Sequence, residues 1–165
     1  MKTIIHDLDN VKTKENSNNI TILEDKLVNN CIGCFNCWTK TPMNCIHNDN
    51  LKKTSKKLLE SDTLIIVSKN TNGTYSSHVK KILERNIGFV YPYFVIRKNE
   101  IHHKLRKNET KNFILIIYGK TTNNEKKLLQ DLALRNSYNF NLEIKNIIFC
   151  KNQSEARRKL YEHIY

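Results

Sequence analysis

The chain has 165 residues and a formal net charge of +12 at pH 7, with 28 Lys and Arg against 16 Asp and Glu. This length predicts one domain whose core is large enough to need no disulfide. No apolar run reaches the roughly 18 residues of a membrane span, so we expect a soluble cytoplasmic protein without a membrane partner. The basic residues are spread along the chain and accompany no nucleic-acid-binding motif, which argues against nucleic acid as a partner.

Short runs of β-branched residues predict the strands of a sheet. Several of these runs are apolar on both faces, as in a parallel sheet that is covered on its two sides. The predicted strands are residues 2–8, 20–23, 63–68, 113–118 and 142–149.

Amphipathic patterns between the strands predict helices over residues 51–61, 76–86, 124–138 and 154–164. In the second of these, Val79, Ile82 and Leu83 recur at the spacing of one helix face, and Ser154 is the expected N-cap of the last. Strands that alternate with helices form right-handed βαβ units. The sequence therefore predicts an α/β three-layer sandwich with a parallel sheet.

Two segments break this alternation. Only the polar residues 9–19 separate the first two strands, which predicts a shortened or absent first crossover helix. Around residues 89–111, two alternating runs (91–97 and 101–106) flank a polar turn, which predicts a β-hairpin inserted in the α/β core. His102 and His103 are adjacent in the second run and point to opposite faces of a strand, so we expect no shared metal and a solvated or dimer-facing hairpin.

Four of the five cysteines, Cys31, Cys34, Cys37 and Cys45, lie in the segment CIGCFNCWTKTPMNC with the spacing C-x2-C-x2-C-x7-C. The two short intervals turn three thiols toward one centre and the longer one returns a fourth, which fits a [4Fe-4S] cluster with one thiolate on each iron. Zinc also accepts four cysteines, but its sites usually join two separate pairs. The spacing favours a cluster, with zinc and metal-free thiols as the alternatives.

Neighbouring residues suit such a loop. Gly33 permits unusual backbone angles, and we expect Phe35 and Trp38 to shield a cluster from water. His47 is a substitute ligand that four cysteines make unnecessary. Cys150, at the end of an apolar strand, is expected to be a small buried hydrophobe.

The cysteine segment, followed by Asp49, a helix, the strand TLIIVS and the helix SSHVKKILER, resembles the flavodoxin-like NAD(P)H-dependent FMN reductases and iron-sulfur flavoproteins. The resemblance covers about residues 20–120, with Met43 where the family pattern has glycine. It implies a flavodoxin-like fold, FMN as cofactor, and electron transfer between FMN and a [4Fe-4S] cluster. NAD(P)H or a redox partner protein is the expected electron source, and we expect a homodimer formed through the hairpin.

Loops at the carboxyl ends of strands bind ligands in open α/β sheets, and the resemblance implies two flavin-contacting loops. The expected FMN-binding residues are Thr71, Asn72, Gly73, Thr74, Tyr75, Ser76, Tyr118, Gly119 and Lys120. Because the cysteine loop follows the second strand, we expect it beside this flavin pocket. The family's phosphate loop follows the first strand, where this chain has HDLDN, whose carboxylates repel a phosphate.

Two functions follow from these features. The first is a redox protein with FMN and a cluster, of the NAD(P)H-dependent FMN reductase type. The second is a non-enzymatic binding module that keeps the fold, lacks FMN, and uses the cysteine loop as a structural site for zinc or a cluster. The sequence has no Ser/His/Asp, paired-carboxylate or P-loop pattern, so it gives no support for hydrolysis or phosphoryl transfer.

Overall fold

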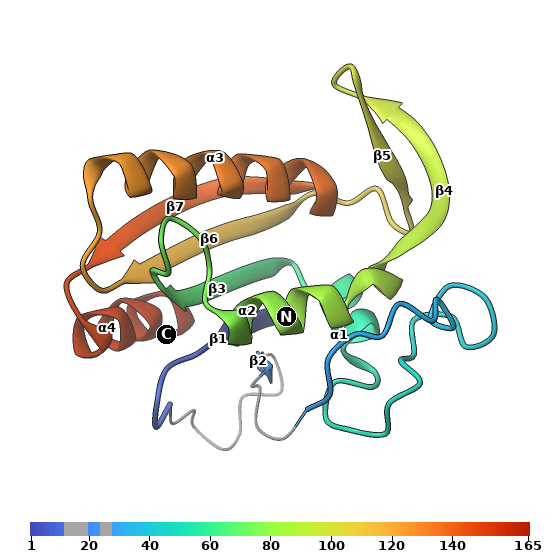
Figure 1. Ribbon diagram of the computed structural model, residues 1–165, viewed down its shortest axis with the longest axis horizontal. Coiled ribbons are helices and arrows are strands. Elements are labelled where there is room, and N and C mark those ends of the chain that lie inside the picture. Colours follow the sequence, from blue (N-terminus) through green and yellow to red (C-terminus); the bar gives the residue numbers. More distant parts are fainter. Residues whose placement is uncertain (12–19, 24–27) are drawn as a thin grey trace.

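The computed structural model describes residues 1–11, 20–23 and 28–165, and five strands of this part form one parallel sheet (Figure 1). The order of the strands is β2-β1-β3-β6-β7. Because this is the 2-1-3-4-5 order of flavodoxin-like folds, the predicted fold class is confirmed. The strands are β1 (Lys2–His6), β2 (Ile20–Leu23), β3 (Thr63–Lys69), β6 (Lys111–Tyr118) and β7 (Leu142–Cys150).

The central strand β3 is apolar on both faces because both faces are covered. It pairs in register with β1, from Lys2 opposite Thr63 to His6 opposite Val67, and with β6 along its whole length. The side chains of residues 64–67 are all 1% exposed or less. This is the burial that the continuous apolar run TLIIV predicts.

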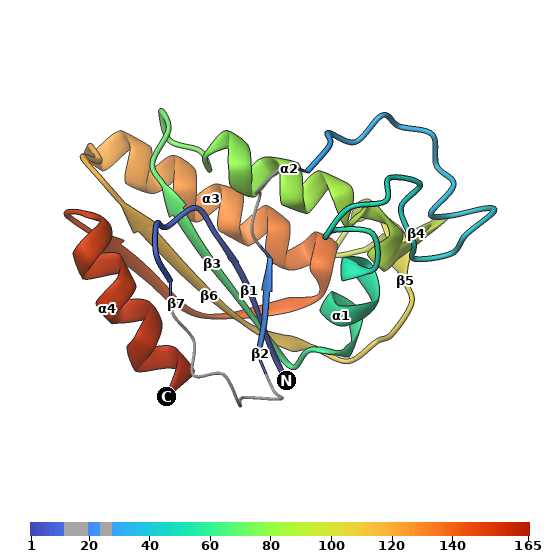
Figure 2. The same ribbon diagram turned by 90° about the horizontal axis from the view of Figure 1, so that it is seen from below.

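Helices lie on both sides of the sheet (Figure 2). The helices α1 (Thr54–Glu60), α2 (Ser77–Arg85) and α3 (Asn123–Phe140) pack on one face, and α4 (Gln153–Ile164) covers the other. The predicted three layers are therefore confirmed. The short crossover predicted at residues 9–19 stays a prediction, because residues 12–19 lie outside the described residues.

Side chains at the helix ends fix where the helices begin. Ser76 accepts a hydrogen bond from the backbone of Val79 at the start of α2, and Thr122 forms a capping box with Glu125 at the start of α3. Asn152 caps α4, so the prediction of Ser154 as its N-cap was wrong by two residues. All three caps satisfy backbone N–H groups that the first turn leaves unpaired.

Lysines at the strand starts close two helix ends. The buried Lys111 donates through Nζ to the carbonyls of Leu59, at 2.8 Å, and of Ser61 at the end of α1. Lys2 donates to the carbonyls of His163 and Ile164, at 2.7 and 3.0 Å, at the end of α4. Positive charge is favourable at this end of a helix, so both lysines join the sheet to its helices.

The predicted hairpin is also confirmed. Its strands are β4 (Val90–Arg97) and β5 (Glu100–Leu105), and it follows the short 3-10 helix η1 (Ile87–Phe89) at the end of α2. Lys98 and Asn99 have φ of 52° and 60°, which is the left-handed geometry of a two-residue hairpin turn. The hairpin projects from the end of the sheet (Figure 1).

His102 and His103 point to opposite faces of β5, as predicted. His102 is 7% exposed, with Nδ1 3.1 Å from the Asn139 side-chain oxygen of α3. The His103 ring lies between those of Trp38 and Phe94, at centroid distances of 4.9 and 4.8 Å. The expected solvated surface is wrong at His102, whose imidazole packs against α3. His103 is half-buried against the cysteine loop, and the dimer-facing alternative stays a prediction.

No helix of the described residues is long and apolar enough to cross a membrane. Cys150 is 4% exposed, as predicted for a small buried hydrophobe.

Replacing Leu160 by Ala tests the packing of α4. Leu160 is fully buried beneath the sheet, so we expect Leu160→Ala to lower the free energy of unfolding by about 2–5 kcal/mol. Leu134→Ala, at a leucine of α3 that is 40% exposed, is the control and costs about 0.5 kcal/mol or less. Urea denaturation of both variants measures the difference, and equal losses would contradict this packing.

Candidate functional site

The cysteine loop, residues 31–45, lies at the end of the sheet where α2 stops (Figure 1). Trp38 Nε1 donates to the carbonyl of Ile87 in η1 at 3.0 Å. A Cβ at Gly88 would lie 3.2 Å from Cys37 Cβ and 3.2 Å from Met43 Cα, which is too close for an ordinary contact. Glycine at position 88 therefore allows the loop to rest directly on η1.

Bulky residues of this loop take a left-handed backbone. Phe35 and Met43 have φ of 55° and 64°, close to the 66° of Gly33. A non-glycine residue in this region costs about 1–2 kcal/mol, and such positions persist where surrounding contacts hold them. Stacking of the Phe35 ring on Trp38, with centroids 5.0 Å apart and planes at 10°, is one such contact. Met43, which stands where the family pattern has glycine, takes a conformation that glycine adopts freely.

A buried ion pair closes the base of the loop. Arg85, at the end of α2, donates through two nitrogens to the Asp49 carboxylate at 2.8 Å each, and also to the carbonyl of Asn29 at 2.6 Å. Asp49 further accepts from the backbone of Asn29 and Leu51. The two charged side chains are 0% and 9% exposed. The hydrogen bonds from Arg85 hold the pKa of Asp49 well below its usual range.

All four cysteines of the loop border one small hollow of about 20 Å³. Burial raises the pKa of the Cys37 thiol, and the other three thiols raise it further. Among the described residues, no three His, Cys, Asp or Glu side chains are placed to hold a metal ion, and all five cysteines are free thiols. The thiols thus surround a common space without converging on one point. The other lining residues are Ile32, Gly33, Phe35, Ile46, His47, Arg85 and Ile87.

Polar atoms of two residues that line this hollow have no hydrogen-bond partner within the described part of the chain. They are Arg85 Nε and His47 Nε2, and both atoms are buried. An unpaired buried polar group costs about 1–3 kcal/mol. A group in the hollow that accepts hydrogen bonds would satisfy Arg85 Nε, and His47 Nε2 in the tautomer that protonates it. The residues around this hollow therefore supply four thiols and two unpaired polar atoms.

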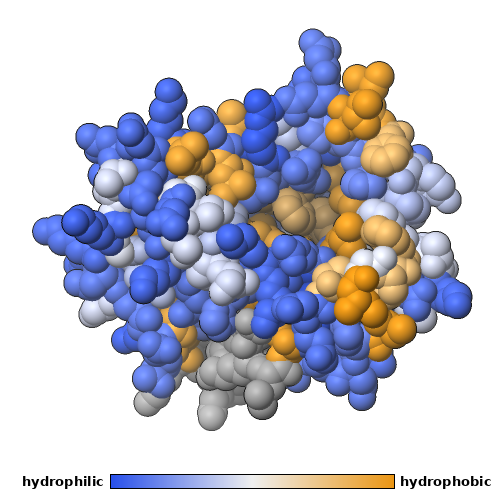
Figure 3. All heavy atoms as spheres, in the orientation of Figure 1, coloured by the Kyte–Doolittle hydropathy of each residue, from blue (hydrophilic) through white to orange (hydrophobic). Residues whose placement is uncertain are grey.

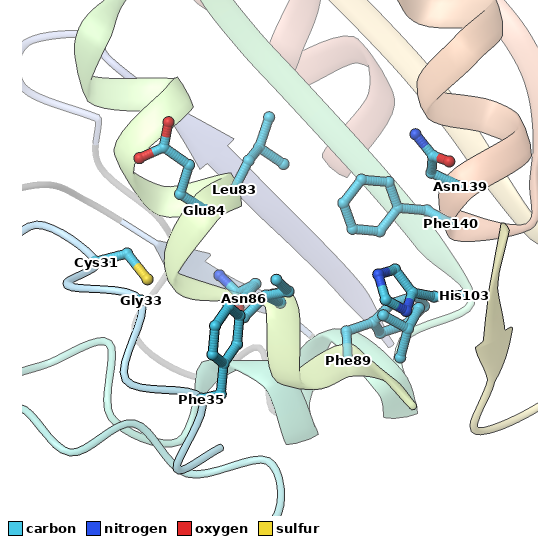
Figure 4. A pocket seen from close by; sticks show the side chains of 12 residues that line it. Cys31, Gly33, Phe35, Leu83, Glu84, Asn86, Phe89, His103, Asn139 and Phe140 are labelled. Carbon is cyan, nitrogen blue, oxygen red and sulfur yellow. The ribbon is translucent and has the colours of Figure 1, made fainter. Parts of the chain in front are cut away.

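A second, larger cavity adjoins the cysteine hollow, with a volume of about 530 Å³ (Figure 4). We call it the apolar pocket. It shares four wall residues with the hollow: Cys31, Gly33, Phe35 and Ile87. Its other residues come from α2, η1, the hairpin and α3: Leu83, Glu84, Asn86, Phe89, Val90, His103, Asn139 and Phe140. Sequence reasoning missed this pocket, because its lining residues come from segments that are far apart in the chain and no single segment carries a recognisable pattern.

Exposed apolar side chains also gather at this end of the molecule, around a hollow in its surface (Figure 3). They belong to the cysteine loop and its flank and to the hairpin: Ile32, Phe35, Ile46, Tyr93, Phe94, Ile96 and Ile101.

The expected flavin loops, residues 71–76 and 118–120, are brought together at the carboxyl edge of the sheet. Asn70 joins them, because its backbone donates to Tyr118 and its side chain donates to the carbonyl of Lys120, at 2.8 and 2.9 Å. Asn72 and Gly73, with φ of 53° and 79°, form a two-residue turn between Thr71 and Thr74. Gly119 also has a left-handed φ, of 99°.

Four of the expected flavin residues are buried: Gly73, Tyr75, Ser76 and Tyr118. Tyr75 is 1% exposed and its hydroxyl accepts from Asn136, and burial raises the pKa of Tyr75 and of Tyr118 to about 12. Ser76 is the N-cap of α2. Thr71, Asn72 and Lys120 are exposed, and Thr74 and Gly119 are half-buried.

The cysteine loop does not lie beside these flavin loops, so this expectation was wrong. The residues that precede the cysteine loop lie along α2, where the carbonyls of Val28 and Asn29 accept from Lys81 and Arg85. The flavin loops adjoin the start of α2, and the cysteine hollow adjoins Arg85 at its end. A nine-residue helix is about 13 Å long, so the two sites lie at opposite ends of the molecule (Figure 1).

Two carboxylates occupy the place of the expected phosphate loop. Asp7 accepts from the backbone of Lys69 at 2.9 Å, and Asp9 accepts from Gln153 at 3.2 Å. A phosphate does not fit beside them. A basic hollow of about 410 Å³ lies farther along the same edge, lined by Gly119, Lys120, Thr121, Lys126, Phe149, Cys150 and Lys151.

No family model matches the chain, and no curated protein matches it. Among solved structures, the chain is similar to the crystal structure of an FMN-dependent NADH-azoreductase from Bacillus anthracis in complex with FMN. The TM-score is 0.51 and the sequence identity 14%, over 99% of this chain and 95% of that one. At this identity the similarity shows the flavodoxin-like fold, in agreement with the strand order.

Asp49→Asn tests the ion pair. The change leaves the Arg85 guanidinium buried without its carboxylate, so we expect a loss of about 3–5 kcal/mol in the free energy of unfolding at pH 7. Because the folded-state pKa of Asp49 is depressed, its contribution is present above the unfolded pKa of about 3.9 and is lost as pH falls below it. The gap between wild type and variant should therefore shrink under acid conditions.

Asp131→Asn is the matched control, since Asp131 is exposed on α3. Chemical denaturation from pH 3 to 7 measures both variants. A pH-independent gap, or the same loss in the control, would show that the ion pair does not hold the loop.

Proposed function

We propose that this protein is a flavodoxin-fold redox protein that carries a [4Fe-4S] cluster on Cys31, Cys34, Cys37 and Cys45 and binds FMN at the carboxyl edge of its sheet. The observation that carries the proposal is the cysteine hollow, which all four thiols border together with buried polar atoms of Arg85 and His47 that have no partner among the described residues.

The spacing of the cysteines in the sequence supports a cluster over zinc. A zinc ion with bonds of about 2.3 Å draws four sulfurs to within about 3.8 Å of one another. A cubane presents a separate iron to each thiolate and keeps the sulfurs farther apart. The thiols here share a hollow of about 20 Å³, and no three of the described metal-ligating side chains converge on one point. The choice of a cluster therefore rests on the spacing C-x2-C-x2-C-x7-C.

The residues around the hollow have defined tasks in this proposal. A bound cluster would supply one-electron transfer. Arg85 donates toward the sulfur atoms, and hydrogen bonds of this kind set the reduction potential of a cluster. The stacked rings of Phe35 and Trp38 cover one side of the loop and limit the access of water. Asp49 holds Arg85 in place.

Several observations support FMN at the carboxyl edge. The azoreductase with a similar fold is FMN-dependent and uses NADH, and open α/β sheets bind ligands at this edge. Thr71, Asn72 and Lys120 present exposed polar groups there. Three lysines line the basic hollow and would supply positive charge for a phosphate: Lys120, Lys126 and Lys151. The loop after β1 offers no such charge, because it carries Asp7 and Asp9.

The two sites lie at opposite ends of α2, and the proposal connects them through a second molecule. NAD(P)H reduces the flavin in this proposal, and a redox partner protein or a second copy of the chain connects flavin and cluster. The exposed Tyr93, Phe94, Ile96 and Ile101 of the hairpin support a homodimer, since apolar patches of this kind mark interfaces.

A specific observation favours a second function. The Asp7 carboxylate accepts from the backbone of Lys69, in the loop after β1 where the FMN reductases that the sequence resembles bind the phosphate. A binding module that lacks FMN and keeps a structural zinc or cluster on the cysteine loop accounts for this contact.

Anaerobic assembly of the cluster tests the first part of the proposal. Incubation with ferrous iron and sulfide should give broad visible absorbance and about four irons per chain. Single Cys→Ser changes at positions 31, 34, 37 and 45 should each reduce the iron content at least twofold. Cys150→Ser is the control, because Cys150 lies on β7 away from the hollow. Stoichiometric zinc without iron would support the second function instead.

FMN titration tests the second part. We expect quenching of flavin fluorescence on binding, and at least tenfold weaker binding for the double variant Lys126→Glu, Lys151→Glu, because a phosphate then meets like charge. Lys104→Glu, at an exposed lysine of the hairpin, is the control. It makes one Lys→Glu change away from the basic hollow, where the double variant makes two within it. Absence of FMN binding in a cluster-loaded wild type would favour the binding module.

A further inference from the structure

The apolar pocket has no task in the proposed electron transfer, and we propose that it binds an uncharged planar aromatic molecule. Its volume of about 530 Å³ falls within the range of small-molecule sites, which are mostly apolar clefts of about 300–1,000 Å³. The pocket lies at the end of the sheet opposite to the flavin loops, so it is a separate site from the one proposed for FMN.

Aromatic side chains from different elements border this pocket. Phe35 comes from the cysteine loop, Phe89 from η1, His103 from β5 and Phe140 from α3 (Figure 4). The rings of Phe89 and Phe140 are 5.4 Å apart at an angle of 41°. Aromatic rings pack best against other aromatic rings, either offset-stacked or edge to face. A flat aromatic molecule therefore matches these walls better than an aliphatic one.

The charge of the pocket determines the charge of its ligand. The chain has 28 Lys and Arg, yet none of them is among the described residues that line this pocket. Its charged side chain is Glu84, which is exposed at the end of α2. A phosphate or carboxylate would be desolvated there without a counter-charge. The pocket thus excludes FMN and NADH and accepts a neutral molecule.

One buried polar atom among the described lining residues is unpaired and can orient the ligand. Asn86 is engaged by Thr54 and by the carbonyl of Ile82, and the side-chain oxygen of Asn139 is engaged by His102. The Nδ1 atom of His103 is buried and has no partner in the described part of the chain. A hydroxyl group on the aromatic molecule can both donate and accept, so it suits either tautomer of this ring.

The position of the pocket links it to the cysteine loop. Cys31, Gly33, Phe35 and Ile87 form a wall that the pocket shares with the cysteine hollow. A molecule in the pocket therefore contacts the loop that carries the thiols. An effect of this contact on electron transfer would rest on the proposed function. The binding of the aromatic molecule itself does not.

Titration with 2-naphthol, followed by NMR of the full-length 15N-labelled chain in reducing buffer, tests the proposal. The chain has one tryptophan, so the indole N–H of Trp38 gives one signal that needs no assignment. This N–H donates to Ile87 in the pocket wall. We expect a saturable shift of the signal with 2-naphthol. Naphthalene-2-sulfonate, which has the same rings and a negative charge, should bind at least tenfold more weakly.

Leu83→Arg places a cation in the wall of the pocket. We expect at least tenfold weaker binding of 2-naphthol and tighter binding of the sulfonate, so that the preference inverts. Leu134→Arg is the control, because Leu134 is a leucine of α3 that is 40% exposed and does not line the pocket. Should Leu83→Arg fail to fold, Phe140→Leu, which removes one ring and keeps an apolar side chain, should weaken 2-naphthol severalfold without improving the sulfonate.

Equal binding of the two probes, or wild-type behaviour of both pocket variants, would overturn the proposal. Loss of 2-naphthol binding on raising the protein concentration would also overturn it, because a second copy of the chain would then fill the pocket. Failure to assemble a cluster would count against the proposed function only, since 2-naphthol binds without any exchange of electrons.

Discussion

The ion pair between Asp49 and Arg85 is the interaction on which the functional end of the molecule depends. It joins the end of α2 to both flanks of the cysteine loop, because Arg85 also binds Asn29 and Asp49 also binds the backbone of Asn29 and Leu51. Both charges are buried, so neither is stable without the other. The ion pair therefore holds the cysteine loop in place, so that the loop forms one wall of the cysteine hollow and of the apolar pocket.

Each end of the sheet has a different chemical character. The carboxyl edge has polar turns, carboxylates on the first loop, and lysines around a basic hollow. The opposite end has thiols, stacked rings and a pocket without cations among its described lining residues. A fold of this type usually places its chemistry at the carboxyl edge. Here the cysteine loop and the hairpin form a second surface at the opposite end of the sheet, separated from the carboxyl edge by the length of α2.

Most elements of the fold were predictable, because their signals are local. The apolar run TLIIV identifies a strand covered on both faces, and the pattern of Val79, Ile82 and Leu83 identifies α2. The N-cap of α4 was misplaced by two residues, since Ser154 and Asn152 are both good caps and only the backbone decides between them. The solvated hairpin was wrong at His102, because its partner Asn139 lies 37 residues away in the chain.

The sequence alone determined the fold class, the cysteine spacing and the absence of the family's phosphate loop after the first strand. Each of these can be recognised from short segments of consecutive residues. Tertiary structure alone decided where the cysteine loop lies. Its place follows from contacts between distant residues, Arg85 with Asp49 and Trp38 with Ile87, which hold the loop away from the carboxyl edge of the sheet. The apolar pocket has the same origin: its rings come from four separate elements of the described chain, and only packing brings them together.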